Sequence, residues 1–374
     1  MKPYADMIKS VKDYVRLPFV YEHWYVAGTG DEFTNNPMSR TLLNRSLVFY
    51  RTSNGDVIAM QNRCLHRSFP LSEGFLEGDQ LVCRYHGIRY TPEGKIARIP
   101  CQAQSSEKKL RTYPTKEVGP FVFIWMGDPE NVGAFPDFSH LADPNYRTLH
   151  DFMTLEGNYL LMAENLNDFT HFSYLHKDTF AFGDAFLDLP VEVKKVDGRI
   201  WCNRVDHNSD TARRFVPPSF MQEAEGKPVE RHDGGMFLTP GIFLGNAPLF
   251  IGAEDDPDRR VLNQPIAHYI TPETETTSHY WWSVSVDFEQ DNEMFFEMLK
   301  PRLDQGFGED KWAVRHMQRL LNDDKIDFDE MIIAGDQAGL LYRRVMLDWV
   351  RAEHGDGQPG PASAMDYSIN QMTD

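Results

Sequence analysis

Two short stretches of this chain each place a cysteine close to a histidine. The first reads Cys64-Leu-His66, and the second, after sixteen further residues, reads Cys83-Arg-Tyr-His86. Each stretch offers one thiolate and one imidazole from a short loop. Together the four side chains suit a [2Fe–2S] cluster in which both cysteines bind one iron and both histidines bind the other.

Structural zinc is the alternative for these residues, because sets of cysteine and histidine also bind zinc. In zinc motifs, two or more residues usually separate the first two ligands, and both of these are often cysteines. Here the two pairs are Cys-x-His and Cys-x-x-His. Each loop mixes a thiolate with an imidazole, as a cluster with two chemically different irons requires, and this favours the iron–sulfur cluster.

A second group of polar side chains lies in the apolar, mostly helical stretch that we predict at 155–175. Asn165, Asp168 and His171 are spaced by three, which puts them near one face of a helix. His176 follows His171 by five positions, which point in different directions on an ideal helix. The two histidines can therefore meet only if the helix ends or kinks between them, and a metal would bring them together.

Two histidines suggest a two-His-one-carboxylate site for iron(II) with open positions for dioxygen, which needs a third ligand. Glu164 precedes His171 by seven residues, roughly 10 Å along a helix, and is too far away. Asp168 is close enough, but it could instead hold a ring N–H of His171. Asp310 is the favoured candidate, because it shares an apolar helix face with residues such as Val314, whereas Glu309 is expected in solvent.

The composition is that of an ordinary globular protein, with 41% hydrophobic and 25% charged residues. A net charge of −18 argues against nucleic acid and against an anionic membrane surface as partners. The motif claims two of the four cysteines, which excludes a disulfide framework and fits a reducing cytoplasm. The N-terminus has no signal-peptide pattern, and no apolar run is long enough for a membrane helix.

The pattern of apolar residues divides the chain into a β-rich part and a mixed part. We expect an N-terminal helix and a small antiparallel β domain in residues 1–140, a second domain in 141–354, and a disordered tail in 355–374. In the first domain, Asn54-Gly55 between two apolar runs predicts a β-hairpin. In the second, helices are expected at about 292–303, 309–321 and 335–353, after several strands.

The Cys-His motif resembles the Rieske iron–sulfur motif. With the later Asn-x-x-Asp-x-x-His-x4-His segment and the Glu-Asp-Lys-Trp helix, it makes the chain similar to the oxygenase components of Rieske non-haem iron oxygenases, from about Trp24 to Ala352. The group around vanillate O-demethylase, phthalate dioxygenase, dicamba monooxygenase and carbazole dioxygenase is the most similar. The resemblance implies the following site residues: Cys64, His66, Cys83 and His86 for the cluster; His171, His176 and Asp310 for a mononuclear Fe(II); and Asn165 and Asp168 as catalytic residues, with Asp168 bridging to a cluster histidine of a neighbouring subunit.

The same resemblance implies the architecture and the partners. The fold would be α+β, with a Rieske domain and a helix-grip (START-like) domain whose curved antiparallel sheet wraps a long helix. The substrates would be O2 and a small aromatic molecule, and the working unit a homotrimer. The chain has no Gly-x-Gly-x-x-Gly after a strand, so NAD(P)H would be used only through a separate reductase, with or without a ferredoxin.

Three functions remain open at this point. The first is an oxygenase, for which hydroxylation or oxidative demethylation is slightly favoured over cis-dihydroxylation of an aromatic ring. The second is a Rieske electron carrier with a structural second domain, against which the set His171, His176 and Asp310 argues. The third is a ligand-binding helix-grip protein, which would leave the cluster unexplained. The substrate and the position of its oxidation are not predicted.

Overall fold

The computed structural model describes residues 10–103, 106–207, 209–323, 328 and 330–355. These residues form two compact units. The small unit is Tyr21–Gly133 with Thr271–Glu275, and the large unit contains the remaining described residues. The expected disordered tail from 356 onward, and the first part of the expected N-terminal helix, lie outside the described residues.

The small unit consists of three antiparallel sheets. Their strand orders are β1-β11-β10, β2-β3-β4-β9 and β5-β6-β7-β8. The strands are β1 Trp24–Thr29, β2 Met38–Leu42, β3 Arg45–Arg51, β4 Val57–Gln61, β5 Phe75–Glu77, β6 Gln80–Val82, β7 Arg89–Tyr90, β8 Ile96–Arg98, β9 Thr112–Tyr113, β10 Thr115–Val118 and β11 Phe121–Trp125. The predicted small antiparallel β domain is therefore confirmed.

The predicted hairpin at Asn54-Gly55 joins β3 to β4. Gly55 takes a φ of +93°, which glycine adopts without a steric penalty, and its amide donates to the carbonyl of Thr52. The register this turn imposes directs Val48, Tyr50 and Met60 into one apolar core. Cys64 and Cys83 belong to the same core, so the sheets hold both cysteine loops in place.

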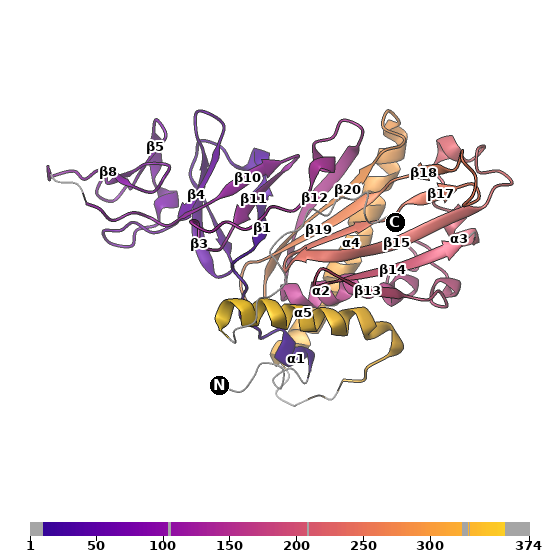
Figure 1. Cartoon of the computed structure of the whole chain (residues 1–374). Helices are drawn as coiled ribbons and strands as arrows, with labels where there is room; N and C mark the ends of the chain where they lie inside the picture. Colours follow the sequence, from indigo (N-terminus) through magenta and orange to yellow (C-terminus); the bar gives the residue numbers. More distant parts are fainter. Residues whose placement is uncertain (1–9, 104–105, 208, 324–327, 329, 356–374) are drawn as a thin grey trace. The chain divides into compact units, whose positions relative to one another are not determined.

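The large unit is built on a nine-stranded antiparallel sheet with the main order β12-β20-β19-β16-β15-β14-β13 (Figure 1). Its strands are β12 Arg147–Leu155, β13 Glu192–Val196, β14 Arg199–His207, β15 Val229–Thr239, β16 Ile242–Asn246, β17 Leu249–Ile251, β18 Arg260–Leu262, β19 Pro265–Pro272 and β20 Ser278–Val286. Its α-helices are α1 Val11–Tyr14, α2 Tyr159–Asn167, α3 Asp210–Arg213, α4 Glu293–Asp323 and α5 Gln337–His354, with a 3-10 turn η5 at Phe169–Ser173.

Helices cover one face of this sheet. The ring of Phe307 from α4 lies 5.1 Å from the ring of His268 in β19 and 5.0 Å from that of Trp282 in β20. Tyr342 from α5 stacks on Phe237 in β15 at 4.4 Å. The α+β class and the antiparallel sheet packed on a long helix are thus confirmed.

The prediction of separate helices at about 292–303 and 309–321 is wrong, because both lie in the continuous 31-residue helix α4. Gly306 and Gly308 lie between the two expected helices. Gly306 allows a close packing contact, since a β-carbon there would lie 2.3 Å from the Phe180 ring. The missing side chain thus admits an aromatic ring against α4 and does not end the helix.

Candidate metal centres and their supporting residues

The two cysteine loops of the small unit have the same backbone geometry. In each loop the cysteine carbonyl accepts a hydrogen bond from the amide four residues later, from Ser68 to Cys64 at 3.0 Å and from Gly87 to Cys83 at 2.8 Å. Ser68 and Gly87 both have a positive φ, +59° and +69°. Two matching turns therefore present their thiol and imidazole groups in equivalent ways.

These loops bring the four predicted cluster residues into an arrangement that suits one group between them. The Nδ1 atoms of His66 and His86 lie 3.2 Å apart on exposed rings, whereas Cys64 and Cys83 are buried. Burial is the main cause that raises the pKa of the Cys83 thiol, so a thiolate there requires a nearby positive charge. Two facing imidazole nitrogens and two buried thiols fit a cluster with one iron at the surface and one inside.

Tyr90 is a supporting residue of these loops that the sequence analysis did not identify. Its hydroxyl lies 3.1 Å from the Cys64 sulfur and also accepts the amide hydrogen of Leu65 at 3.1 Å. Hydrogen bonds to ligand sulfurs are one of the means by which a protein sets the potential of an iron–sulfur cluster. The contact crosses from β7 to the first loop, so sequence spacing gave no signal for it.

The second group of polar residues lies where α2 ends. Asn158 caps the start of α2 by accepting the Leu160 amide at 2.8 Å, and the helix stops at Asn167. Asp168 then has an extended backbone, with φ −111° and ψ +104°, and its Oδ1 accepts the amide of Thr170 at 2.7 Å to start η5. The α-helix therefore ends before both histidines, and only η5 ends between them, at Ser173; no continuous helix joins His171 to His176, as expected, whereas a common helix face for Asn165, Asp168 and His171 is wrong.

The break in the helix lets three predicted ligands converge. Asp310 Oδ1 from α4 lies 3.1 Å from Nε2 of His176 and 3.4 Å from Nε2 of His171. One ligand atom from each of the three residues can be chosen so that all lie within 4.8 Å of one another, a spacing that can hold a metal ion. Two histidines and one carboxylate are the donor set of non-haem iron(II) sites with open positions.

The buried polar atoms of this set also fit a cation. Burial acts to raise the pKa of Asp310, but its contacts with His171 and His176 outweigh burial and hold the pKa well below its usual range. Both ring nitrogens of His171 are buried and have no hydrogen-bond partner among the described residues. Such groups are costly to bury unless something binds them, and a coordinated metal would satisfy both observations.

Glu309 supports the set, and its expected position in solvent is wrong. Its Oε2 lies 2.8 Å from Nδ1 of His176, and its Oε1 accepts hydrogen bonds from the Thr179 hydroxyl at 2.5 Å and from Gln305 at 3.0 Å. Because Nε2 of His176 faces Asp310, the Glu309 contact fixes both the ring orientation and the tautomer. Because the two residues are 133 positions apart, the spacing of residues around Glu309 could not predict this contact.

The other polar residues at and after α2, Asn165, Glu164 and Asp168, have separate roles. Asn165 donates from Nδ2 to Asp310 Oδ1 at 3.0 Å, which orients the carboxylate. Glu164 forms a two-point ion pair with Arg343 of α5, and one of the two contacts is 2.9 Å. This ion pair links α2 to α5. Among the described residues, Asp168 accepts side-chain hydrogen bonds only from Thr170 and does not hold a ring N–H of His171.

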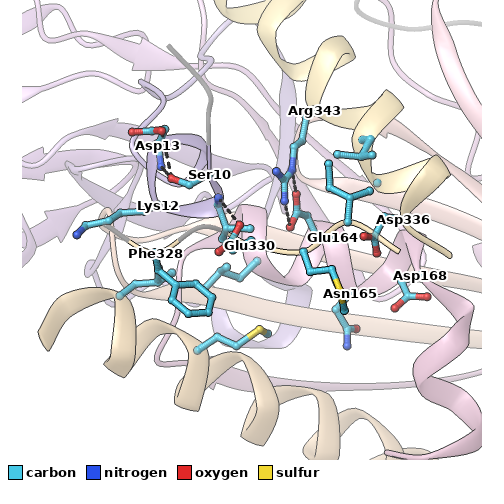
Figure 2. Close-up of a pocket in the computed structure, with 18 of the residues that line it drawn as sticks. Ser10, Lys12, Asp13, Glu164, Asn165, Asp168, Phe328, Glu330, Asp336 and Arg343 are labelled. Atoms are coloured by element: carbon cyan, nitrogen blue, oxygen red, sulfur yellow. Dashed lines mark hydrogen bonds and ion pairs between the residues drawn. The ribbon is translucent and has the colours of Figure 1, made fainter. Parts of the chain in front are cut away.

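A cavity of about 1040 Å³ lies behind this set within the large unit (Figure 2). Asn165, Asp168 and His171 line one end of it. The remaining lining comes mostly from α1, α2, α4, α5 and the segment before α5, which includes Phe328 and Glu330. Asp168 therefore borders an open space.

Removal of the Glu309 carboxylate is expected to weaken the metal site without disturbing the cluster. Glu309→Ala leaves His176 without its partner, and loss of such an outer contact typically costs 10- to 100-fold in metal affinity. Competition with a chelator for added ferrous iron under anaerobic conditions measures this. Glu297→Ala, at an exposed site on the same helix, is the matched control. Equal iron affinity in the two variants would contradict a positioning role for Glu309.

Comparison with known proteins identifies the family. The family model for the Rieske [2Fe-2S] domain matches residues 23–114, and the model for the vanillate O-demethylase oxygenase C-terminal domain matches residues 155–352. The iron–sulfur subunit of the toluene-4-sulfonate monooxygenase system of Comamonas testosteroni is 32% identical over 91% of this chain and 100% of that protein. The oxygenase component of dicamba O-demethylase from Stenotrophomonas maltophilia is 31% identical over 81% of this chain and 89% of its own length.

Solved structures agree with the sequence relatives. The crystal structure of dicamba monooxygenase bound to dicamba matches with a TM-score of 0.76 and 28% identity, and covers 90% of this chain and 99% of that one. Its complex with 3,6-dichlorosalicylic acid matches with a TM-score of 0.79 at the same identity. Both domains, their order along the chain and their fold are thus shared, and the chain belongs to the Rieske non-haem iron oxygenases, as an oxygenase component.

Proposed function

We propose that this protein uses O2 to hydroxylate or oxidatively demethylate a small aromatic substrate, with electrons from a separate reductase. Cys64, His66, Cys83 and His86 hold a Rieske [2Fe–2S] cluster, and the second set holds one Fe(II). The convergence of His171, His176 and Asp310 within 4.8 Å carries the proposal. An electron carrier would have no use for this second set.

The residues of the second site have distinct tasks. A mononuclear iron with three protein ligands has open positions at which dioxygen binds, and the Rieske cluster supplies single electrons. Asp310 contributes the negative charge of the ligand set. Asn165 orients that carboxylate by its hydrogen bond, and Glu309 keeps Nε2 of His176 directed at the metal.

The surroundings of the site favour an aromatic substrate. The rings of Phe172 and Phe180 lie 5.7 and 5.1 Å from that of His176. Toluene-4-sulfonate, dicamba and vanillate, the compounds for which the similar oxygenases are named, are all aromatic. These relatives are monooxygenases or demethylases, which favours this chemistry over cis-dihydroxylation for the present protein.

The assembly that we propose is a homotrimer in which the cluster of one subunit serves the iron of the next through Asp168. The Oδ1 atom of Asp168 accepts hydrogen bonds from the amide and the hydroxyl of Thr170. The Oδ2 atom has no hydrogen-bond partner among the described residues. This oxygen is available to a histidine of a neighbouring copy at the cavity that Asp168 borders. The electrons originate from NAD(P)H and arrive through a reductase, with or without a ferredoxin.

We expect the protein to act away from membranes and nucleic acid, in the cytoplasm. The net charge of −18 disfavours binding to either polyanionic surface. In the described part of the chain, no helix has the length and apolar character that crossing a bilayer requires.

Iron and acid-labile sulfide, measured on anaerobically purified protein, test the metal content. The proposal expects about three irons to two sulfides per chain, from one cluster and one mononuclear site. About two irons to two sulfides, unchanged after addition of ferrous iron, would favour the electron-carrier function. Protein with both metals is then screened against aromatic acids and ethers, and oxygenated or demethylated products are identified by mass.

A further inference from the structure

A buried arginine of the large unit has no ion-pair partner among the described residues. Arg204 on β14 is 2% exposed, and none of the described carboxylates lies within ion-pair distance of it. Its Nη1 donates to the Phe186 carbonyl at 2.7 Å, whereas its Nε is buried without a hydrogen-bond partner in the described part of the chain. Burying a charge is costly unless an opposite charge compensates it. The guanidinium therefore has a requirement that the bond to Phe186 does not meet.

The carboxylates nearest to Arg204 in the sheet already have partners. Asp233 lies opposite Arg204 in the register of β14 and β15. Arg231 donates to both carboxylate oxygens of Asp233, at 2.7 Å from Nη2 and at 2.9 Å from Nε. Asp206, two positions after Arg204, accepts hydrogen bonds from the amide and the hydroxyl of Ser209. A buried bidentate ion pair is a strong contact, so Asp233 is committed to Arg231 and not to Arg204.

An apolar cluster links the surroundings of Arg204 to Asp168. The cluster contains Phe169, which follows Asp168, and Phe186. The ring of Phe186 lies 5.1 Å from the guanidinium of Arg204. Burial lowers the pKa of Arg204, and the carboxylate of Asp168 is the charge that acts most strongly against this effect, ahead of Asp233. Opposite charges attract more strongly through an apolar interior than through water, so the two side chains are coupled without a direct contact.

We propose that Arg204 is the internal countercharge of Asp168 and a positioning residue for electron transfer between subunits. Asp168 is half-buried, and among the described residues its side chain accepts hydrogen bonds only from Thr170, which is uncharged. A nearby cation favours the charged form of a carboxylate, and Arg204 supplies this cation from behind the apolar cluster. Asp168 then accepts the cluster histidine of a neighbouring copy as an anion. The inference rests on the proposed function, because it assumes the bridge through Asp168.

The first test measures the thermal unfolding of the full chain and needs no turnover. Asp168→Asn keeps an oxygen for Thr170 but leaves Arg204 buried without its countercharge, so the midpoint temperature should fall. Arg204→Met removes the buried charge at a similar side-chain length. Adding Arg204→Met to Asp168→Asn should therefore raise the midpoint temperature again. A double variant that unfolds at a still lower temperature would overturn the proposal and would assign Arg204 to the support of the fold.

The second test follows electron transfer out of the cluster. After reduction with dithionite, the cluster is reoxidised with O2 and the aromatic compound identified in the product screen. Arg204→Met should slow this step about 10-fold, less than the about 100-fold expected for loss of Asp168 itself. Arg204→Lys keeps the charge and should reoxidise nearly normally. Arg199→Met, which removes another buried arginine of β14 on which Asp197 and not Asp168 acts, is the matched control.

The outcomes of these tests are distinguishable. Equal reoxidation rates in Arg204→Met and Arg199→Met would contradict the role of Arg204 in electron transfer. In the Asp168→Asn background, Arg204→Met should cause no further slowing, because no carboxylate charge remains to be balanced, and further slowing would equally contradict the proposal. If the reduced cluster of the unmodified protein is not reoxidised through the iron, the proposed function itself fails. The unfolding experiment would then still decide whether Arg204 and Asp168 are charge partners.

Discussion

Asp310→Asn is expected to remove the mononuclear iron and to abolish oxygenation while the cluster stays intact. The replacement takes away the charge of a set in which the other two ligands are neutral histidines. A buried carboxamide cannot replace a carboxylate whose Oδ1 faces both His176 and His171 at 3.1 and 3.4 Å. The loss of activity should exceed the 10- to 100-fold that is typical when an outer partner of a metal ligand is lost.

Iron content separates this effect from misfolding. The variant should contain about one iron fewer per chain, with unchanged sulfide and an unchanged visible spectrum of the cluster. Asp304→Asn, which removes a carboxylate from the same helix at a surface ion pair with Lys300, is the matched control and should keep all its iron. An Asp310→Asn variant that retains the third iron would show that the carboxylate ligand lies elsewhere.

The residues that could be predicted from the sequence are those whose chemistry is carried by close spacing. The paired loops at Cys64 and Cys83 follow from two residue types in two short motifs. A spacing of five predicts that no continuous α-helix runs through His171 and His176, and in the structure α2 ends before both of them. Asp310 was predicted because a carboxylate on an apolar helix face requires a partner, and the structure places that carboxylate against both histidines.

Two of the three residues that escaped prediction, Glu309 and Gly306, depend on contacts between distant segments. Glu309 is a charged residue of the kind that usually lies in solvent. Its role comes from hydrogen bonds with Thr179 and His176, which lie 130 and 133 residues earlier. Gly306 lies between two helices that the sequence analysis kept separate, but the helix is continuous there, and the ring of Phe180 occupies the space that a side chain would need. Asp168 was placed on a helix face, yet it ends α2, because its side chain accepts the Thr170 amide and so starts η5. Glu309 and Gly306 thus depend on partners far away along the chain, which a single sequence does not reveal, whereas the contact that fixes Asp168 is local.

Asp168→Asn is expected to nearly abolish turnover although both metals remain bound. Neither of the converging metal sets includes Asp168, so its replacement leaves every proposed ligand in place. Its Oδ1 accepts hydrogen bonds from Thr170, its Oδ2 has no hydrogen-bond partner in the described part of the chain, and Asp168 lines the cavity (Figure 2). If Oδ2 accepts a ring N–H of a cluster histidine from a neighbouring subunit, the amide weakens that contact and the electron path through it. Loss of such positioning can cost about 100-fold in rate.

The measurement that isolates the bridging role follows the two half-reactions separately. Dithionite should reduce the cluster of Asp168→Asn at the normal rate, while reoxidation of the cluster in the presence of substrate and O2 should be slowed about 100-fold. Asp336→Asn changes another carboxylate of the same cavity and is expected to reoxidise normally. Normal, fully coupled turnover in Asp168→Asn would exclude the bridge. Because dithionite needs no partner protein, slow reoxidation after normal reduction would place the defect between cluster and iron.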